Sequence, residues 1–476
     1  MTRPVRSAWG LVVAAGAMFP SGALGGCSDR PPEGHIVLHI DTDAPVPSIL
    51  RPPPVPRAAG IRPQLDLTRT PALFDRLRVE FYSRVDETPC STCVGDFQLD
   101  EGTFSRGATV TARGNVDRVR VRLYRSADQN DGDITPGTTV EVVARLPPHG
   151  EENAVHASVF LATETMGQPT GKLDAPIPAS LDLPEKSKVG TWKPAKRTNC
   201  LTAPRSGEVC VPGGAYIMGG GALIQTIPDP RQLGQRIATI SPFFLDSREV
   251  TVRAIRGWLE RTRKPPESVL ERWNRLDGPE DNHCTYDRDD ALPINCIAKE
   301  AAREYCQSLG ADLPTEGEYE YVAGGMTSLR YVWGKDNPEC HSVIWNPETE
   351  LTPNCPTVSN PVAWAENDGK RTRDQLVLPT GTIYDLAGNL SEMVLDVAAT
   401  EKDPCWPEGG SRLIANPLCT KPSLRPDLEP LIVLRGGNWT AQNAILLRAA
   451  LRAFVDSGPP PAGLYSTVGF RCARHL

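Results

Sequence analysis

The stretch of sequence that decides the fold lies near the end of the chain, between Val433 and Cys472. It contains VLRGGNWT at 433–440, LLRAALRAFVD at 446–456 and VGFRC at 468–472. No cysteine occurs from Asn438 to Phe470. The two ends of the stretch are typical of one fold family. The absence of cysteines between them removes thiol side chains from this part of the chain.

Five further motifs precede this stretch along the chain. They are VPGGAYIMGG at 211–220, ISPFFLDSREVT at 240–251, LPTEGEYEY at 313–321, YVWG at 331–334 and YDLAGNLSE at 384–392. Together with RGGNW and GFRCA, this ordered series resembles the formylglycine-generating enzyme family, the sulfatase-modifying factors. The resemblance covers 199–476. It implies an α+β domain with a modified C-type-lectin-like fold and much irregular structure.

Helices are expected at three places in this domain. One passes through Trp258 and Leu259, and a second spans Ile297–Leu309 with apolar residues along one face. A third begins at Thr315, because a threonine followed three residues later by Glu318 forms a capping box.

The family's catalytic cysteines are missing from this chain. The resemblance implies two cysteines that bind copper and oxidise a substrate cysteine, and their positions fall near Ala441 and Leu446. Neither side chain offers a metal ligand or a nucleophile, so copper is not expected. The family's active-site serine falls on Asn438 and a neighbouring histidine on Gln442. If the family cleft is retained, Asn438, Trp439 and Gln442 would line it.

These departures favour a non-catalytic binding or scaffold module with an unknown peptide or glycan ligand. Because the catalytic cysteines of the family are missing, the sequence favours a protein that is not an enzyme. The alternative is a formylglycine-generating oxidase acting on sulfatase cysteines, or another family enzyme of the non-haem iron type. Against iron, the seven histidines are scattered. A net charge of −7 argues against a nucleic-acid partner.

The resemblance also implies one calcium site and one long-range disulfide. The calcium ligands would be the carboxylates of Asp385 and Glu392 and the carbonyls of Gly388 and Leu390, oxygen ligands of the kind this cation takes. The alternative is that Gly388-Asn389 forms only a tight turn. The implied disulfide joins Cys306 to Cys472.

Other cysteines are spaced for local bridges. The expected pairs are Cys200–Cys210, Cys284–Cys296, Cys340–Cys355 and Cys405–Cys419. Cys90 and Cys93 form a CxxC motif, which favours a structural bridge because the residues after it read as a β-strand rather than a helix. Twelve cysteines beyond Cys27 fit an oxidising compartment.

The N-terminal residues predict export. Arg3 and Arg6 precede a short apolar run, and Leu-Gly-Gly-Cys ends at Cys27, so 1–26 is predicted as a lipoprotein signal peptide. Lipidation of Cys27 would anchor the protein to a membrane, and Ser28 favours the outer membrane, facing either the periplasm or the cell surface. The alternative is an ordinary cleaved signal with a chance cysteine.

The remaining N-terminal sequence divides by composition. Residues 27–71 are rich in proline and predict a tether, although His35–Ile40 could add one strand. Residues 72–173 show period-two alternation and predict an all-β sandwich domain. Its arginine-rich face contains interspersed acids, which favours a solvated sheet face. Residues 174–198 predict a second linker.

Overall fold

A computed structural model describes most of the chain in two compact units. The described residues are 12–13, 35–47, 67, 70–84, 87–89, 93–99, 107–113, 116–126, 129–130, 133–149, 154–220, 233–270, 283–340, 343–347, 355, 373–400, 403–406, 412–421, 431–455 and 465–475. One unit comprises Met1–Pro52, Thr70–Ala195 and Gly409–Leu413, and the other comprises Pro53–Arg69, Lys196–Glu408 and Ile414–Leu476.

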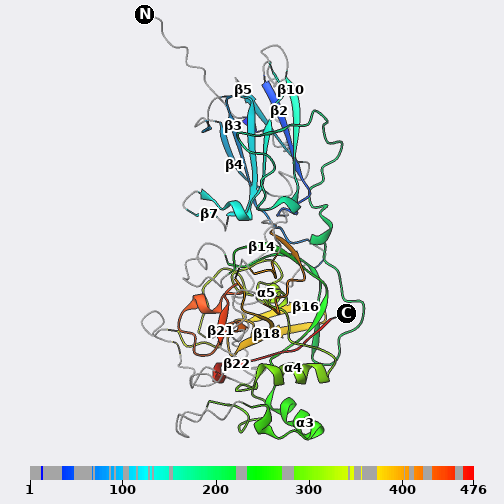
Figure 1. Ribbon diagram of the computed structural model, residues 1–476, viewed down its shortest axis with the longest axis vertical. Helices are drawn as coiled ribbons and strands as arrows, with labels where there is room; N and C mark the ends of the chain where they lie inside the picture. Colours follow the sequence, from blue (N-terminus) through cyan, green and yellow to red (C-terminus); the bar gives the residue numbers. More distant parts are fainter. Residues whose placement is uncertain are drawn as a thin grey trace, which may run out of the picture. The chain divides into compact units, whose positions relative to one another are not determined.

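The first unit is built from two β-sheets (Figure 1). The first sheet has the order β1 (Val12–Val13), β5 (Ala108–Arg113), β2 (His35–Thr42), β10 (Val155–Leu161). The second has the order β11 (Ile177–Pro178), β9 (Val140–Arg145), β6 (Arg118–Tyr124), β3 (Arg76–Tyr82), β4 (Val94–Gln98). A short hairpin pairs β7 (Gln129–Asn130) with β8 (Asp133–Ile134). Strand β10 contacts β9 and β6 of the other sheet.

The predicted period-two alternation is present in these strands. In β6, Val119, Val121 and Leu123 are fully buried, while the arginines between them are partly exposed. Strands β3 and β9 bury their alternating apolar residues in the same way. Because successive side chains of a strand point to opposite faces, one face of this sheet forms the core of the unit.

The arginine-rich face is held together by ion pairs across the strands. Glu80 of β3 accepts hydrogen bonds from Arg78 at 2.8 Å and from Arg122 of β6 at 2.6 Å. Arg120 of β6 pairs with Glu141 of β9 at 2.8 Å. These arginines therefore have carboxylate partners within the sheet.

Parts of the predicted tether (27–71) and of the predicted linker (174–198) belong to this unit. Strand β2 lies within the predicted tether, 27–71. Its alternating residues Ile36, Leu38 and Ile40 are buried in the core of the unit. In the stretch 174–198, Ser180 exchanges two backbone hydrogen bonds with Ser158, and Trp192 is buried. Both stretches therefore contribute buried side chains or backbone hydrogen bonds to the first unit. Of the predicted signal peptide, only Val12 and Val13 are described, and Cys27 lies outside the described residues.

In its described residues, the second unit combines small sheets with three α-helices. Its strands are β12 (Glu208–Val211), β13 (Gly214–Met218), β14 (Arg236–Ile240), β15 (Phe243–Asp246), β16 (Gln375–Leu378), β17 (Gly381–Tyr384), β18 (Ser391–Val397), β19 (Leu413–Ala415), β20 (Ile432–Arg435), β21 (Ala453–Val455), β22 (Val468–Gly469) and β23 (Ala473–His475). They form sheets ordered β12-β15-β23, β13-β14-β19, β16-β17 and β21-β20-β18-β22. The expected α+β content with much irregular structure is therefore present.

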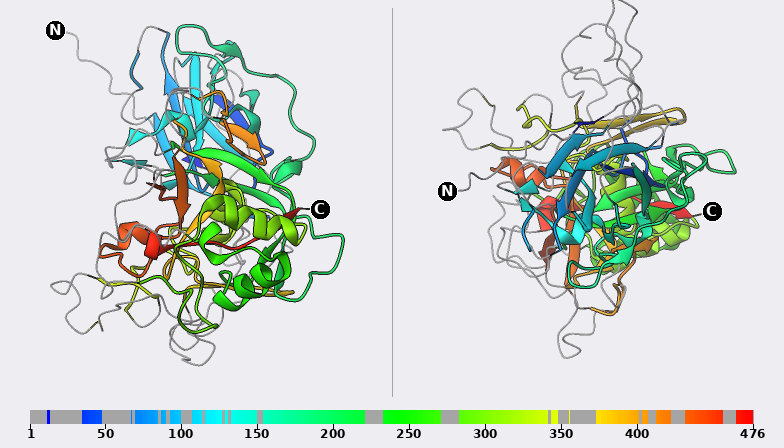
Figure 2. Two further views of the ribbon diagram at one scale, coloured as in Figure 1. Left: turned by 60° about the horizontal axis from the view of Figure 1, so that its bottom comes forward. Right: turned by 90° about the horizontal axis from the view of Figure 1, so that it is seen from above.

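The helices are α3 (Val252–Thr262), α4 (Lys299–Ser308) and α5 (Glu316–Ala323), close to their predicted positions. Helices α3 and α4 lie side by side (Figure 2) and share a buried apolar cluster. In this cluster the rings of Trp258 and Tyr305 meet edge to face, with centroids 5.8 Å apart. The predicted capping box of α5 is confirmed. Thr315 accepts from the Glu318 N–H, and the Glu318 carboxylate accepts from the Thr315 N–H.

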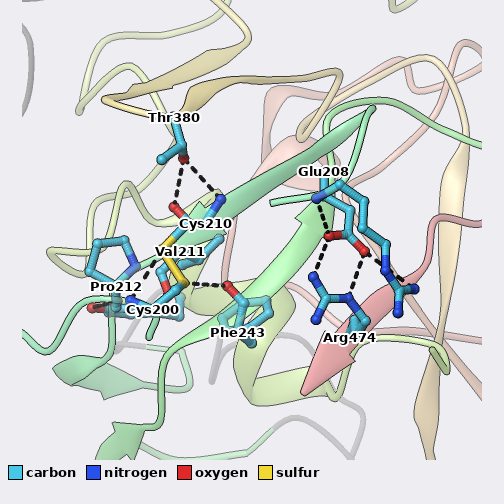
Figure 3. Close-up of a disulfide and its surroundings, with 10 residues drawn as sticks. Cys200, Glu208, Cys210, Val211, Pro212, Phe243, Thr380 and Arg474 are labelled. Carbon is cyan, nitrogen blue, oxygen red and sulfur yellow. Dashed lines mark hydrogen bonds and ion pairs between the residues drawn. A yellow bond between two sulfur atoms is a disulfide. The ribbon is translucent and has the colours of Figure 1, made fainter. Parts of the chain in front are cut away.

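Strand β12 is fixed at both ends by different interactions (Figure 3). At one end the disulfide from Cys200 reaches Cys210, whose N–H donates to the Thr380 hydroxyl at 2.9 Å. At the other end Glu208 accepts two hydrogen bonds from Arg474 of β23, at 2.8 and 2.6 Å. The first and last strands of the family domain therefore lie in one sheet with β15 between them.

Candidate functional site

The RGG motif forms a sharp turn at the end of β20. Gly436 and Gly437 have φ values of 94° and 72°, a region that side chains other than glycine rarely occupy. A Cβ at Gly436 would collide with the Tyr319 hydroxyl, and one at Gly437 would lie 2.6 Å from the Leu446 carbonyl oxygen. Both glycines are therefore required for the close approach of the turn to its neighbours.

Asn438 follows this turn and is held by hydrogen bonds. Its Nδ2 donates to the Ser391 hydroxyl at 3.0 Å, and its Oδ1 accepts from the N–H and hydroxyl of Thr440 at 3.0 and 2.6 Å. The Ser391 hydroxyl in turn donates to the Gly437 carbonyl at 3.0 Å. The hydrogen bonds of Asn438 stabilise the turn. Its side chain is half-buried, so part of it is also accessible at the surface. No local sequence pattern indicated this role of Ser391.

Trp439 is buried, although the sequence predicts it as a cleft-lining residue. Its indole packs with Ile344 and Leu390, and its Nε1 donates to the Ser466 carbonyl at 3.3 Å. The His283 ring lies 5.3 Å from the indole, centroid to centroid. Since both the ring and its N–H are occupied by the protein, Trp439 supports the site rather than stacking on a ligand. Gln442, the third predicted cleft residue, is exposed.

The two positions that match the family's copper cysteines lie in different environments. Ala441 is 4% exposed and belongs to the main apolar core, whereas Leu446 is 42% exposed within a 3-10 turn, Ala444–Leu447. Every cysteine among the described residues is disulfide-bonded. The described part of the chain therefore presents no free thiolate near these positions.

The disulfides match the expected spacing. The structure contains Cys200–Cys210, Cys284–Cys296, Cys340–Cys355, Cys405–Cys419 and Cys306–Cys472, the last being the pair that the resemblance implies. Cys93 is also disulfide-bonded, and Cys90 lies outside the described residues.

The segment proposed to hold calcium lies between β17 and β18. Asp385 adopts φ 55°, and a Cβ at Gly388 would lie 2.5 Å from the Ile344 carbonyl oxygen, which explains the glycine. The Leu390 N–H donates to Glu249 at 3.1 Å. Glu392 uses both carboxylate oxygens to bind Arg471, an interaction that the calcium prediction did not include.

Two further buried acids surround this segment, and the sequence did not single them out. Burial, reinforced by the charges of Asp385 and Glu392, raises the pKa of the Glu249 carboxyl well above its ordinary value. Burial and the charge of Asp385 raise the pKa of Asp374 to about 8. Asp385 thus lies in an acid-rich environment, where a divalent cation would offset the negative charge. Glu392 is already paired with Arg471, and no group of three or more His, Cys, Asp and Glu side chains in the described residues is arranged to hold a metal.

Buried arginines and glutamates connect the motifs. Arg435 of the RGG motif donates to Glu316 and Glu320 of α5, and it also donates to the Leu451 carbonyl at 3.0 Å. Arg452 binds the same Glu316 through Nε and Nη2. Because all four side chains are at least 94% buried, this cluster supports the fold rather than presenting an acid or base to solvent.

A comparison with family models locates a match on the second unit. A family model described as the sulfatase-modifying factor enzyme 1-like domain matches residues 194–476, more than half of the chain. The serine/threonine-protein kinase pkn1 of Chlamydia pneumoniae is 25% identical over 191 residues, 39% of this chain, which spans only 24% of that protein.

Two solved structures have similar folds. PvdO from Pseudomonas aeruginosa is 19% identical, with a TM-score of 0.38, over 56% of this chain and 94% of that chain. The Treponema denticola variable protein 1 is 15% identical, with a TM-score of 0.37, over 56% of this chain and 95% of that chain. From the family match, this chain belongs to the family of the sulfatase-modifying factor enzyme 1-like domain.

Proposed function

We propose that this chain is an exported lipoprotein whose family domain is a non-catalytic binding or scaffold module at the cell envelope. The observation that carries the proposal is the pair Ala441 and Leu446, which replaces the two cysteines that the family chemistry needs. Soft thiolate ligands select Cu(I), and neither an alanine nor a leucine side chain can replace them.

The environment of the two positions supports the same conclusion. Ala441 packs in the core and Leu446 is exposed, so the two side chains do not share one surface. The cysteines of the described residues are joined as disulfides, and a paired sulfur is not available as a thiolate ligand.

The exposed turn after the RGG motif is the proposed recognition surface. Thr440 and Gln442 are exposed there, and Asn438 is half-buried beneath them. Amide and hydroxyl groups fixed by a rigid turn suit hydrogen bonding to a peptide or a glycan. Trp439 holds the turn in place by packing beneath it.

The recognition surface is tested with the unmodified protein and Gln442→Ala on a panel of immobilised peptides and glycans. Gln98→Ala, which removes an exposed glutamine from the other unit, is the matched control. A ligand whose binding is weakened by Gln442→Ala and kept by Gln98→Ala supports the proposal. Equal binding by all three proteins contradicts it.

The alternative function is an enzyme, either a formylglycine-generating oxidase or an iron-dependent member of the family. Family membership favours it, but an iron centre requires a group of ligands. No group of three or more histidine, cysteine, aspartate and glutamate side chains in the described residues is arranged to hold a metal. The non-catalytic proposal is therefore preferred.

The absence of catalysis is tested with a peptide that carries the sulfatase cysteine motif, in the presence of copper and oxygen. The proteins compared are the unmodified chain, the double variant Ala441→Cys with Leu446→Cys, and a matched double variant with serine at both positions. Aldehyde in the peptide is detected by mass spectrometry. Aldehyde formation by the unmodified protein overturns the proposal, and activity gained only with cysteines supports it.

Export and anchoring form a separate part of the proposal. They rest on the signal-like sequence before Cys27. Among the described residues, no helix has the length and apolar character needed to span a bilayer. We expect Cys27→Ala to move the protein from the outer-membrane fraction to the soluble fraction and to stop incorporation of labelled fatty acid. Retention of the variant in the membrane contradicts the lipid anchor.

The first unit is proposed as an all-β sandwich domain. Support comes from its two sheets, the contacts of β10 with β9 and β6, and the buried alternating residues of β6. Sheets that pack face to face bury such residues between them.

A further inference from the structure

Two histidines far apart in sequence meet on one face of the first unit. Strands β2 and β10 run parallel, with His39 opposite Ser158 and His156 opposite Val37. The two histidines are therefore diagonal neighbours, and their side chains lie on the same face of the sheet. The other face carries the buried Ile36, Leu38, Ile40, Ala157 and Val159. The histidines thus lie on the face opposite these core residues.

The ring nitrogens of the pair are as close as two ligands on one metal ion. His39 Nε2 and His156 Nδ1 are 3.0 Å apart, and the rings are stacked with centroids 5.3 Å apart and an interplanar angle of 24°. Imidazole nitrogens bind transition metals at about 2.0–2.1 Å. Two such ligands at adjacent coordination positions lie about 3 Å apart. Without metal the two nitrogens share a hydrogen bond, so to bind one ion the donating ring must rotate and carry its proton on its other nitrogen.

The surroundings of the pair suit a metal ion that comes from solution. His156 is exposed and His39 is half-buried, so an ion can reach both rings. Burial and the neighbouring His156 lower the pKa of His39, which favours the neutral imidazole that binds metals. Asp41 lies on the same face but accepts hydrogen bonds from the Ser187 hydroxyl and the Lys188 N–H, so its carboxylate is engaged elsewhere.

We propose that His39 and His156 form a two-histidine site for a divalent transition-metal ion, bound through Nε2 of His39 and Nδ1 of His156. Imidazole suits copper, nickel and zinc, and Cu²⁺ binds such sites most tightly among the first-row divalent ions. Two protein ligands leave the other coordination positions to water or to a donor group of another molecule. This site is independent of the family domain and of its missing cysteines.

The test is a Cu²⁺ titration of the full chain, purified with its disulfides intact and without a polyhistidine tag, against a competing chelator. The proteins compared are the unmodified chain, His39→Asn, His156→Asn and the matched control His149→Ala. His149 is in the same unit, and its Nδ1 lies 3.1 Å from the Pro147 carbonyl oxygen. Electron paramagnetic resonance of the bound Cu²⁺ reports the number of nitrogen ligands.

We expect one Cu²⁺ bound by two imidazole nitrogens in the unmodified protein and in His149→Ala. His39→Asn and His156→Asn should each weaken that site by more than about tenfold, since even changes to the partners of metal ligands cost this much. Unchanged melting temperatures in the absence of metal show that the variants are folded. Affinity unaffected by either substitution overturns the proposal, and so does an equal loss in His149→Ala, which would mean binding by scattered histidines only.

Discussion

Arg471 and Glu392 form a two-point ion pair in which both side chains are fully buried. Arg471 Nε lies 2.7 Å from Oε2 of Glu392, and Nη2 lies 2.6 Å from Oε1. Nη2 also donates to the carbonyls of Tyr384 and Asp385, at 2.9 and 3.1 Å. The GFRC motif thereby holds both ends of the segment between β17 and β18.

The first prediction concerns this pair. Glu392→Gln leaves the Arg471 charge buried without a counter-charge, and we expect a loss of about 3–5 kcal/mol in the free energy of unfolding. The matched control is Glu304→Gln. Its partner Lys264 and Glu304 are 34% and 51% exposed, so the change should cost less than about 1 kcal/mol. Urea unfolding measures the free energy of unfolding of both variants. An equal loss of stability in Glu392→Gln and Glu304→Gln would contradict the prediction that the buried pair contributes more.

The second prediction concerns the disulfide between Cys306 and Cys472, which closes a sequence separation of 166 residues. Replacing both cysteines with alanine should reduce stability by about 5 kcal/mol in the chain-entropy model. The matched control removes Cys340–Cys355, with a separation of 15, and should cost about 3 kcal/mol. Non-reducing peptide mapping checks the pairing directly. Either thiol found free, or joined to another cysteine, would contradict the bridge.

The third prediction concerns calcium. We expect a chelator to lower the melting temperature of the protein, because a cation bound only by the folded state stabilises that state. Asp385→Asn should remove this response, since it deletes the carboxylate that the segment offers besides the paired Glu392. The control Asp287→Asn changes an exposed acid and should keep the response. A melting temperature unaffected by the chelator counts against the site.

Features governed by nearby residues could be predicted from the sequence. The capping box at Thr315 depends on Glu318, three residues away, and the alternation of β6 is read along one strand. The ordered motifs also indicated the family, because each is short and local.

Several features that depend on distant residues were missed, whereas the Cys306–Cys472 bridge was expected only through the family resemblance. Arg435 bonds to Glu320, 115 positions away, and no local pattern specifies this partner. The parallel pairing of β2 with β10 joins His39 to His156, 117 positions apart, so the sequence showed only scattered histidines. Trp439 was placed in a cleft because sequence alone does not show which neighbours cover a side chain.

The fourth prediction concerns pH and rests on Asp246 at the end of β15. Burial, together with the charges of Glu208 and Glu392, raises the pKa of this carboxyl to about 7, although the Cys472 N–H and Arg471 oppose the shift. In the unfolded chain the pKa is about 3.9. The folded state therefore binds this proton more tightly. The stability contributed by Asp246 is fully present below about pH 4 and is lost as the pH rises through about 7.

Asp246→Asn removes this titration while its side-chain oxygen still accepts from the Cys472 N–H, an interaction that spans 2.9 Å in the unmodified protein. We expect the variant to gain stability relative to the unmodified protein as the pH rises from 5 to 8, by at most about 1.4 kcal/mol per pH unit. Urea unfolding at several pH values measures the difference, with Asp287→Asn as the exposed control. A difference that stays constant across this range would show that Asp246 does not titrate as its burial predicts.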